Sequence, residues 1–568
     1  MPSKVVRGGC RAASMNVSRI ASLAGVATVT AIGGCSSPFH STASERAPSL
    51  PLERFREVQT MTPTPAPPRT TDPLAPPSRR TQYSGTIELS LEQCRAAAMT
   101  NNLDLKVALI APTIANESLT EAEAAFEATF GLSGSYSRTD APTSSSLQDA
   151  QAEFQSLEPS VQIPLRTGGV ASISLPMTRT ETNNPFTTLD PSYSSDLRFS
   201  LSHSLLRGAG RFATTYGILV ASYGDQIAQA QAKIAVINQL AAVDRVYWSV
   251  YQLRRELEVR QRQFEVAQAQ LETAQRRLDA GAGVEIDVVR AQAGVANSLD
   301  AIIQTENALF AQQRQLKRII NMPDLDVDSP AMIVPITDPD PMEYVLDSAA
   351  LVGVALAERM ELLELELRLA MDAAGIRYQE NQALPTLDLN ASYVLNGLGG
   401  SLGDSLEVMA ENDFEDWSIG FRGSMPLGNE AARSRIRSAV LSRMQRLATK
   451  QSREQTVRQE VFDAVDSMKA GWQRILAARQ SVILNGRALE AEQRQFAQGV
   501  NTSNDVLDAS ARLADAQSAE IRAIVDYQNA QMNLAVATGM VTGAARVRWA
   551  PAESPELEGP FFAPRAER

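Results

Sequence analysis

The sequence predicts a mainly α-helical protein that also contains β-strands, built from one unit of helix, strand, strand, helix and helix that occurs twice. Three observations carry this prediction: two apolar heptad repeats, an internal repeat that aligns without a gap, and the lack of long apolar runs beyond the N-terminal segment. A membrane-spanning helix needs about 20 apolar residues. We therefore assign any membrane crossing to the strands.

Apolar residues at intervals of seven mark the two longest predicted helices. Such heptads form a narrow seam on a helix that coils around its neighbours. We expect long helices at 212–280 and 431–498, each about 100 Å at about 1.5 Å per residue. We expect shorter helices near 91–126 and 284–320, so that two short helices placed end to end match one long helix. The seam residues are Val236, Val243, Val250, Leu257, Phe264, Leu271 and Leu278, and then Val461, Met468, Ile475, Val482, Leu489 and Phe496.

An internal repeat joins helices to strands. Residues 102–136 align with residues 359–393 at an offset of 257, and no gap is needed. In both copies a helical pattern gives way to alternating apolar and polar residues, which is typical of a half-buried strand. A second pair of strands, 196–201 and 416–421, recurs at an offset of 220 and leads through glycines into the long helices. Between the copies, five prolines in 321–342 exclude a continuous helix.

Each long helix is predicted to end in a short turn that leads into a returning helix. The two turns occupy residues 281–289 and 499–508. In each of them a Gly ends one helix and polar residues precede the first apolar position of the next. We predict that these turns are the tips of two helical hairpins.

The N-terminus has the pattern of an export signal. Basic residues precede an apolar run at 20–32, which is too short for a spanning helix, and the sequence Ile-Gly-Gly-Cys follows and ends at Cys35. This sequence resembles a bacterial lipobox, which would place a lipid anchor containing palmitate on Cys35; an ordinary cleavage site with an incidental cysteine is the alternative. The start codon is either Met1 or Met15. The segment 36–85 contains ten prolines and is predicted to be an extended tether.

Composition narrows the possible functions. The net charge of −12 speaks against a general nucleic-acid binder. With only His40 and His203, histidine-based catalysis or metal binding is hard to build, and Cys10, Cys35 and Cys94 cannot form a disulfide framework. No nucleophile–base pair or metal-ligand cluster stands out, so we expect neither an enzyme nor a cofactor.

These features resemble the TolC-like outer-membrane efflux proteins over about residues 86–543. The helix-to-strand transitions, the Gly-to-Asp tips and the sequence Ser-Leu-Leu-Arg-Gly at 204–208 carry the resemblance. It implies a homotrimer in which each copy gives four strands to one twelve-stranded outer-membrane β-barrel, and its helices to a long α-helical barrel in the periplasm. Four strands alone would leave two open edges in hydrocarbon, so closure by other copies agrees with the resemblance.

The implied function is that of a passive export channel of a tripartite efflux or type I secretion system. Its partners would be a periplasmic adaptor protein, an inner-membrane pump and outer-membrane lipid. The alternative is a periplasmic adaptor or a structural coiled-coil lipoprotein. An adaptor would need a pair of lipoyl-like half-motifs around one hairpin, and a filamentous scaffold would not explain the recurring strands.

The resemblance also implies roles for the tips. Asp505 and Asp508 align with the acidic residues that line the narrow periplasmic end of the family's channel, Asp287 is the counterpart of Asp505 in the first repeat, and Arg290 is that of Asp508. Three copies would form an acidic ring that attracts cations; alternatively, Asp505 and Asp287 are helix N-terminal caps. The residues expected to contact the adaptor are Gly281, Gly283, Val284, Gly499, Val500 and Asn501.

Two segments depart from the simplest pattern of the family. Between 139 and 196, two apolar stretches flank Gly168 and Gly169 and predict an added hairpin, which leaves open which strands enter the barrel. The glycine-rich stretch 397–403 lies between two predicted strands, so we interpret it as an exposed loop and not as a phosphate-binding loop. The predicted domains are the signal peptide (1–34), lipid-anchored Pro-rich linker (35–85), first TolC-like repeat (86–322), connector (323–342), second TolC-like repeat (343–543) and C-terminal tail (544–568).

Overall fold

The computed structural model describes residues 85–143, 150–184 and 186–545. The chain divides into two units, 1–72 and 73–568, and all described residues belong to the second unit. The predicted signal peptide, Cys35 and most of the linker lie outside the described residues, as does the C-terminal tail from residue 546. None of the described helices is both long and apolar enough to cross a membrane.

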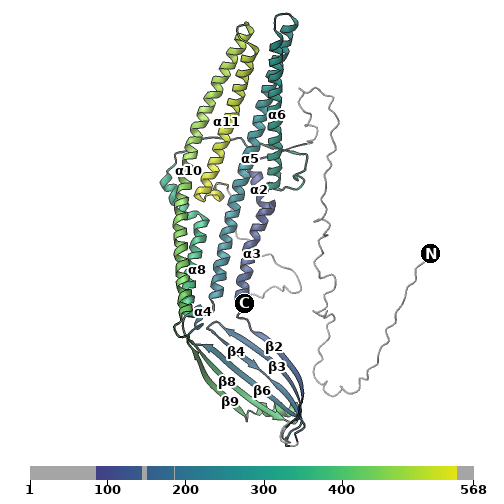
Figure 1. The fold of residues 1–568 in the computed structure, drawn as a ribbon, viewed down its shortest axis with the longest axis vertical. Coiled ribbons are helices and arrows are strands. Elements are labelled where there is room, and N and C mark those ends of the chain that lie inside the picture. Colours follow the sequence, from purple (N-terminus) through teal and green to yellow (C-terminus); the bar gives the residue numbers. More distant parts are fainter. Residues whose placement is uncertain (1–84, 144–149, 185, 546–568) are drawn as a thin grey trace, which may run out of the picture. The chain divides into compact units, whose positions relative to one another are not determined.

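The helical part consists of two long helices, each packed along shorter ones (Figure 1). Helix α5 contacts α2, α3 and α6, and helix α10 contacts α7, α8 and α11, so the predicted pairing of one long with two shorter helical segments is confirmed. The helices among the described residues are α2 (Leu91–Asn101), α3 (Leu103–Ala124), α4 (Arg211–Thr214), α5 (Tyr216–Asp279), α6 (Glu285–Ile320), α7 (Ser348–Glu358), α8 (Met360–Gln382), α9 (Leu402–Glu411), α10 (Glu430–Ala497), α11 (Ser503–Thr538) and α12 (Val541–Ala544).

The heptad seams face the partner helices as predicted. On α5, Phe264 is 6% exposed and packs against Val295 and Ile302 of α6. On α10, Val461 and Ile475 are fully buried, in clusters that include residues of α7 and α11. The seams therefore supply the apolar contacts that hold each long helix to its neighbours.

The predicted helix at 91–126 is wrong in one respect, because it is two helices separated by a break at Asn102. Asn102 has an extended backbone conformation, and its side chain caps α3 by accepting a hydrogen bond from the Leu105 N–H at 2.8 Å. The break between α7 and α8 falls at Arg359, 257 residues further on. Both helix breaks and the strand starts at Thr129 and Thr386 keep the predicted offset.

The sheet contains more strands than the four expected from the resemblance. Seven strands form it, and six of them follow the order β2-β3-β4-β6-β8-β9 (Figure 1). The seventh, β5, also pairs with β3 and β6. β4 and β5 follow one another between the same two neighbours, β3 and β6, so together they occupy one strand position. The sheet is therefore six strands wide. The strands are β2 (Thr129–Asp140), β3 (Gln151–Leu165), β4 (Gly169–Ser174), β5 (Met177–Thr182), β6 (Ser192–Ser204), β8 (Thr386–Gly399) and β9 (Glu415–Ser424).

The added hairpin is the reason for the difference. The predicted hairpin about Gly168 and Gly169 is present as β3 and β4, and these strands enter the sheet between β2 and β6. All neighbouring strands are antiparallel. The four strands expected per copy therefore do not agree with this sheet.

The glycine-rich stretch 397–403 is also different from the expected loop. Strand β8 continues to Gly399, and Ser401 caps helix α9 by accepting a hydrogen bond from the Asp404 N–H at 3.2 Å. A Cβ atom at Gly397 would lie 2.0 Å from the Ser405 carbonyl oxygen, so the glycine permits α9 to pack directly on the sheet. The alternation of β8 did not indicate this short helix.

No helix forms between Asn321 and Asp347, in agreement with the proline argument. This connector contains a strand that the sequence did not reveal, β7 (Met332–Pro335), which pairs in parallel with β1 (Thr86–Leu89). Ile333 is fully buried in the same cluster as Leu316. The connector is therefore packed against α5 and α6 and is not a free linker.

Candidate functional site

The tip of the second hairpin is a tight turn with an acidic helix start. Gly499 has a φ of +76°, a conformation that favours glycine, and α11 begins at Ser503. Asp505 completes a capping box: its carboxylate accepts hydrogen bonds from the Thr502 N–H at 2.9 Å and the Thr502 hydroxyl at 2.7 Å. These bonds from Thr502 hold the pKa of Asp505 below its ordinary value.

Asp505 therefore has a capping role. Thr502 is the N-cap residue of α11, and Asp505 is the third residue of the helix and completes the capping box. Asp508 lies one turn further along α11 and accepts a hydrogen bond from the Asn504 side-chain amide at 3.1 Å. Asn501, an expected adaptor contact, turns inward and donates to Gln495 at 2.6 Å and also to Glu492. Asp508 is thus the acidic side chain of this tip that serves no capping role.

The first tip has different electrostatics. Gly281 ends α5 with a φ of +71°, and α6 begins at Glu285 after Val284, whose side chain makes no capping hydrogen bond. Asp287 lies in the first turn of α6 and is 4.0 Å from Arg290, so the capping alternative is not realised there. The two tips thus differ at the paired positions Asp508 and Arg290, as the sequence indicates.

Both tips expose apolar side chains beside their charges. Val284 is 57% exposed and Val500 is 72% exposed. The two hairpins touch near their ends, where the Arg277 guanidinium lies 4.1 Å from the centre of the Phe496 ring and donates to the Phe496 carbonyl oxygen at 3.1 Å. Exposed apolar residues on a fixed turn are typical of a protein contact surface.

The sheet has two chemically different faces. Residues that are paired across neighbouring strands form rows through all six strand positions. Side chains of successive rows point to opposite faces, so one row lies on the apolar face and the next on the polar face. The apolar row is Phe130, Val161, Ile173, Phe199, Tyr393 and Trp417. The polar row is Thr129, Gln162, Ser172, Ser200, Ser392 and Ser418.

Side-chain hydrogen bonds run across the polar face. Ser172 and Ser200 are bonded at 2.6 Å and Ser392 and Ser418 at 2.8 Å, which links β4 with β6 and β8 with β9. On the opposite face Phe130 and Trp417 are 67% and 71% exposed. The alternation of individual strands was predicted, whereas these serine pairs were missed because they depend on the register between strands.

Among the strands that the structure describes, the two outer ones of the sheet, β2 and β9, have one unpaired edge each. Helix α3 leads into β2 and helix α10 follows β9. Both helices carry an exposed apolar stripe: α3 has Leu103, Val107, Ile110 and Ile114, and α10 has Val440, Leu441, Met444 and Leu447. Open edges and apolar stripes thus occur together at the two sides of the chain.

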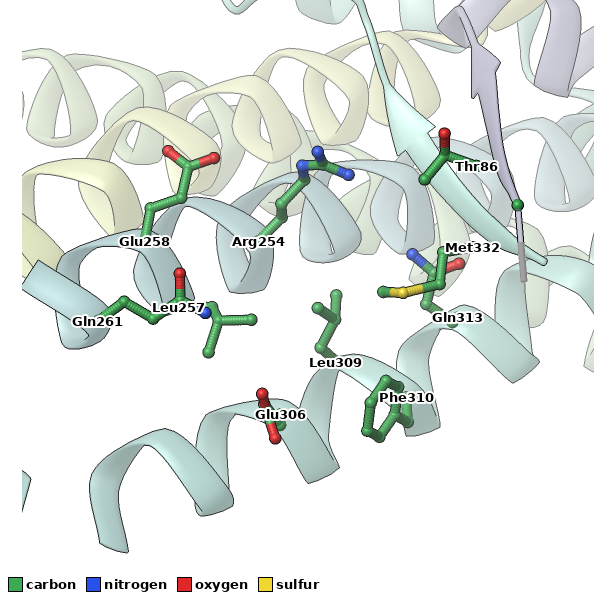
Figure 2. A pocket seen from close by; sticks show the side chains of 11 residues that line it. Thr86, Arg254, Leu257, Glu258, Gln261, Glu306, Leu309, Phe310, Gln313 and Met332 are labelled. Carbon is green, nitrogen blue, oxygen red and sulfur yellow. The ribbon is translucent and has the colours of Figure 1, made fainter. Parts of the chain in front are cut away.

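A cleft of about 630 Å³ lies between α5, α6 and the small β1–β7 sheet. Figure 2 shows Arg254 and Leu257 on one wall and Leu309 and Phe310 on the other. Gln313 has a structural role, because its side-chain amide donates a hydrogen bond to the Ile333 carbonyl oxygen at 2.7 Å and accepts one from the Ile333 N–H at 2.9 Å. We assign the cleft to the docking of the connector and not to catalysis.

Cys94 is fully buried in the core of the first repeat. Burial raises the pKa of its thiol to about 12, and the nearby Asp244 carboxylate acts in the same direction. A thiol that stays protonated is a poor nucleophile. Within the described residues, no group of three or more His, Cys, Asp or Glu side chains is arranged to hold a metal ion.

Comparison with known proteins supports the resemblance. Residues 351–540 match the family described as outer membrane efflux protein. The chain is 28% identical to the outer membrane protein TolC of Escherichia coli over 191 residues, and 26% identical to the outer membrane efflux protein BepC of Brucella suis over 319 residues. The aligned regions cover 32% and 54% of this chain, and 38% and 64% of those relatives, which is less than two thirds of their length.

Solved structures agree on the fold. The outer membrane protein VceC of Vibrio cholerae has a TM-score of 0.59 at 17% identity, and the similarity covers 79% of this chain and 96% of VceC. The open-state MtrE outer membrane channel of Neisseria gonorrhoeae has a TM-score of 0.56 at 17% identity, covering 85% of this chain and 99% of MtrE. The solved structures share the fold of this chain, and the family match and the curated relatives show that its sequence is similar to the outer-membrane efflux proteins.

Proposed function

We propose that this protein is the outer-membrane channel of a tripartite efflux or type I secretion system, a passive conduit from the periplasm to the exterior. The observation that carries this proposal is the sheet, with an exposed apolar face on one side and a serine-lined polar face on the other. A strand sheet in a membrane needs an apolar face for lipid and a polar face for water. Such a conduit performs no covalent chemistry, and its energy comes from an inner-membrane pump.

The open edges support closure by other copies, and the resemblance implies three of them. Hydrocarbon offers no partners for the free N–H and C=O groups of β2 and β9, so these edges must pair with other copies. The stripe on α3 and the stripe on α10 would meet in the same contact, since each helix adjoins one open edge. Such a head-to-tail interface closes a ring when the rotation between copies fits.

The hairpin tips are proposed as the gate and as the surface for the periplasmic adaptor. Asp508 and Asp287 of three copies would place a ring of carboxylates at the narrow end, and Arg290 would replace the second carboxylate of the first tip. The exposed Val284 and Val500 would contact the adaptor. A lipid on Cys35 would tether each copy to the outer membrane; this residue lies outside the described part of the chain.

The alternative, a periplasmic adaptor or structural lipoprotein, is not favoured for two reasons. The curated relatives are outer membrane efflux proteins. In the periplasm, the exposed apolar face of the sheet would also lack a lipid environment. Conductance in planar bilayers tests the proposal. Protein purified from detergent-extracted outer membranes should form ion channels. A monomer that forms no channel would contradict the proposal.

The gate can be tested without disturbing the capping box. Asp508→Asn removes a carboxylate and keeps Asp505 in place, so we expect weaker block of the channel by multivalent cations. Glu490→Gln, on the exposed surface of α10, is the matched control that removes one charge away from the tip turn. Equal block in Asp508→Asn and in the unchanged protein would reject the gate assignment.

A further inference from the structure

The hairpin inserted between β2 and β6 has the chemistry of a membrane-spanning wall. On β3, five alternate residues on the apolar face are Leu157, Pro159, Val161, Ile163 and Leu165. The stretch from 157 to 165 is nine residues long, and a tilted strand needs about 9–11 residues to span the hydrocarbon. Strand β3 of the insert is therefore long enough to cross the hydrocarbon of a membrane.

The insert also continues both faces of the sheet. Ile173 of β4 lies between Val161 and Phe199 in the apolar row, and it is 42% exposed. Ser172 lies in the polar row and bonds to Ser200 of β6. A shift of one residue in the pairing of β4 would exchange its two faces, so the continuous rows require this register. A loop folded over the channel mouth would not require it.

The residue types on the apolar face change at the point where β5 takes the place of β4 between β3 and β6. Beyond Met177, the alternate residues on the same face are Arg179 and Glu181, which form an ion pair. The Arg179 guanidinium also donates to the Tyr193 hydroxyl at 3.2 Å. A change from apolar residues to charged residues and tyrosine is typical of the border between hydrocarbon and headgroups.

We infer that the β3–β4–β5 insert is part of the barrel wall, so that three copies close a barrel of eighteen strands through β2 of one copy and β9 of the next. The inference rests on the proposed trimeric channel. Barrel diameter grows roughly linearly with strand number, so eighteen strands give about 1.5 times the diameter of twelve. The outer part of this channel would admit solutes that a twelve-stranded barrel excludes.

Paired cysteine variants test whether the insert lies in the wall. In outer-membrane vesicles, Ser172→Cys should react with a membrane-impermeant maleimide, whereas Ile173→Cys should be protected by lipid. Ser392→Cys, on β8, is the reference for a lumen position outside the insert. Equal labelling of the two insert variants, with Ser392→Cys labelled, would overturn the inference, whereas an unlabelled Ser392→Cys would count against the channel itself.

Deletion of the insert tests the width. Removal of residues 141–191 would join β2 to β6, which are already oriented as the two arms of a hairpin and share the apolar row through Phe130 and Phe199. Maleimide–poly(ethylene glycol) reagents of increasing mass, added from outside, should reach Ser392→Cys up to a larger mass in the full chain than in the deletion variant. The same mass limit in both proteins would overturn the wider barrel. If the deletion variant does not assemble, the labelling of Ser172→Cys and Ile173→Cys decides.

Discussion

The two repeats place a helix break at equivalent positions and stabilise it with different chemistry. In the first repeat, Asn102 is 3% exposed; it caps α3 and donates to the Ile319 carbonyl oxygen at 2.9 Å. In the second, Arg359 is 6% exposed and forms ion pairs with Glu361 at 2.8 Å and with Glu460. The backbone of the unit is thus retained while the side chains that hold it change.

The same contrast recurs next to the break. In the first repeat, Arg95 of α2 and Asp244 of α5 form a two-pronged ion pair at 2.7 and 2.5 Å, and the Asp244 side chain is 3% exposed. The residue 257 positions after Arg95 is Val352, which packs with Val461 and Val465 in an apolar cluster. One helix contact is therefore held by charge in one repeat and by apolar packing in the other.

The largest expected effect is at this ion pair. Arg95→Met leaves the buried Asp244 carboxylate without its partner, and removal of one member of a buried pair typically costs about 3–5 kcal/mol. Because Arg95 keeps some solvent contact, we expect a value near the lower end. The opening free energy of the α2 amides, measured by hydrogen exchange, should fall by about 3 kcal/mol.

A double replacement sharpens the comparison between the repeats. Arg95→Met with Asp244→Leu converts the contact into an apolar one like that around Val352, and such replacements are often neutral or stabilising. The double variant should recover most of the opening free energy lost in Arg95→Met. A double variant as weak as the single one would show that the charge itself, and not the filling of this space, holds α2 to α5.

The strand connections of the two repeats differ as well, since α9 connects β8 to β9 where the first repeat has its extra strands. Gly397→Ala would push a methyl group against the Ser405 backbone, and such overpacking costs about 1–3 kcal/mol. Gly420→Ala on β9 is the control, because a Cβ atom there meets nothing within 4 Å. Proteolysis of the β8–β9 connection should accelerate in Gly397→Ala alone, and equal rates in both variants would contradict the close packing of α9.

At the helix break of the first repeat the expected effect is smaller. Asn102→Ala removes the cap of α3, which is worth about 1 kcal/mol, together with the hydrogen bond to Ile319. Asn101→Ala, one residue earlier and on the side of α2, keeps the cap and serves as the control. Hydrogen exchange at the first turn of α3 should accelerate in Asn102→Ala, and unchanged exchange would show that the break is held without its cap.

The smallest expected effect is a difference in pH dependence. Burial acts to raise the pKa of Glu361, but the hydrogen bonds from Arg359 outweigh it and lower the pKa below 4.5. The ionised Glu361 therefore stabilises the folded state above pH 4.5, and this stabilisation is lost as the pH falls through the lowered pKa. Burial raises the pKa of Asp244 above 3.8 in spite of Arg95, so its contribution is greatest below 3.8 and decreases as the pH rises through the raised pKa.

Acidification should therefore weaken the start of α8 and not the contact between α2 and α5. Hydrogen exchange from pH 6 to pH 3, corrected for the intrinsic rate of each amide, measures both regions in one sample. Glu361→Gln should remove the acid dependence at α8. If both regions weaken alike, the assigned charges do not account for the difference between the repeats.

Much of the fold was predictable because its signals are periodic. The heptads locate α5 and α10 to within a few residues, and the offset of 257 aligns helix breaks, caps and strand starts in both repeats. The break at Asn102 was missed in the helix expected near 91–126, although the repeated helical pattern begins at Asn102 and Arg359, as the structure has it. Strand β7 was missed because its partner β1 lies about 250 residues earlier and only this tertiary pairing makes it a strand.

The candidate site was predictable in position and less so in chemistry. The tip turns occur at Gly281 and Gly499 as expected, because glycine accepts the positive φ that ends each helix. The hydrogen bonds of Asp505 with Thr502 depend on side-chain placement, so sequence alone left capping and gating as alternatives. The sheet width could not be derived from the resemblance, because the insert has no counterpart in the simplest pattern of the family.

Electron cryomicroscopy of the detergent-extracted particle tests the central claim most directly. We predict three copies around one hollow axis, with β2 of each copy paired to β9 of the next and the serine row facing the lumen. A lone copy, or copies whose β2 and β9 edges remain unpaired, would contradict it.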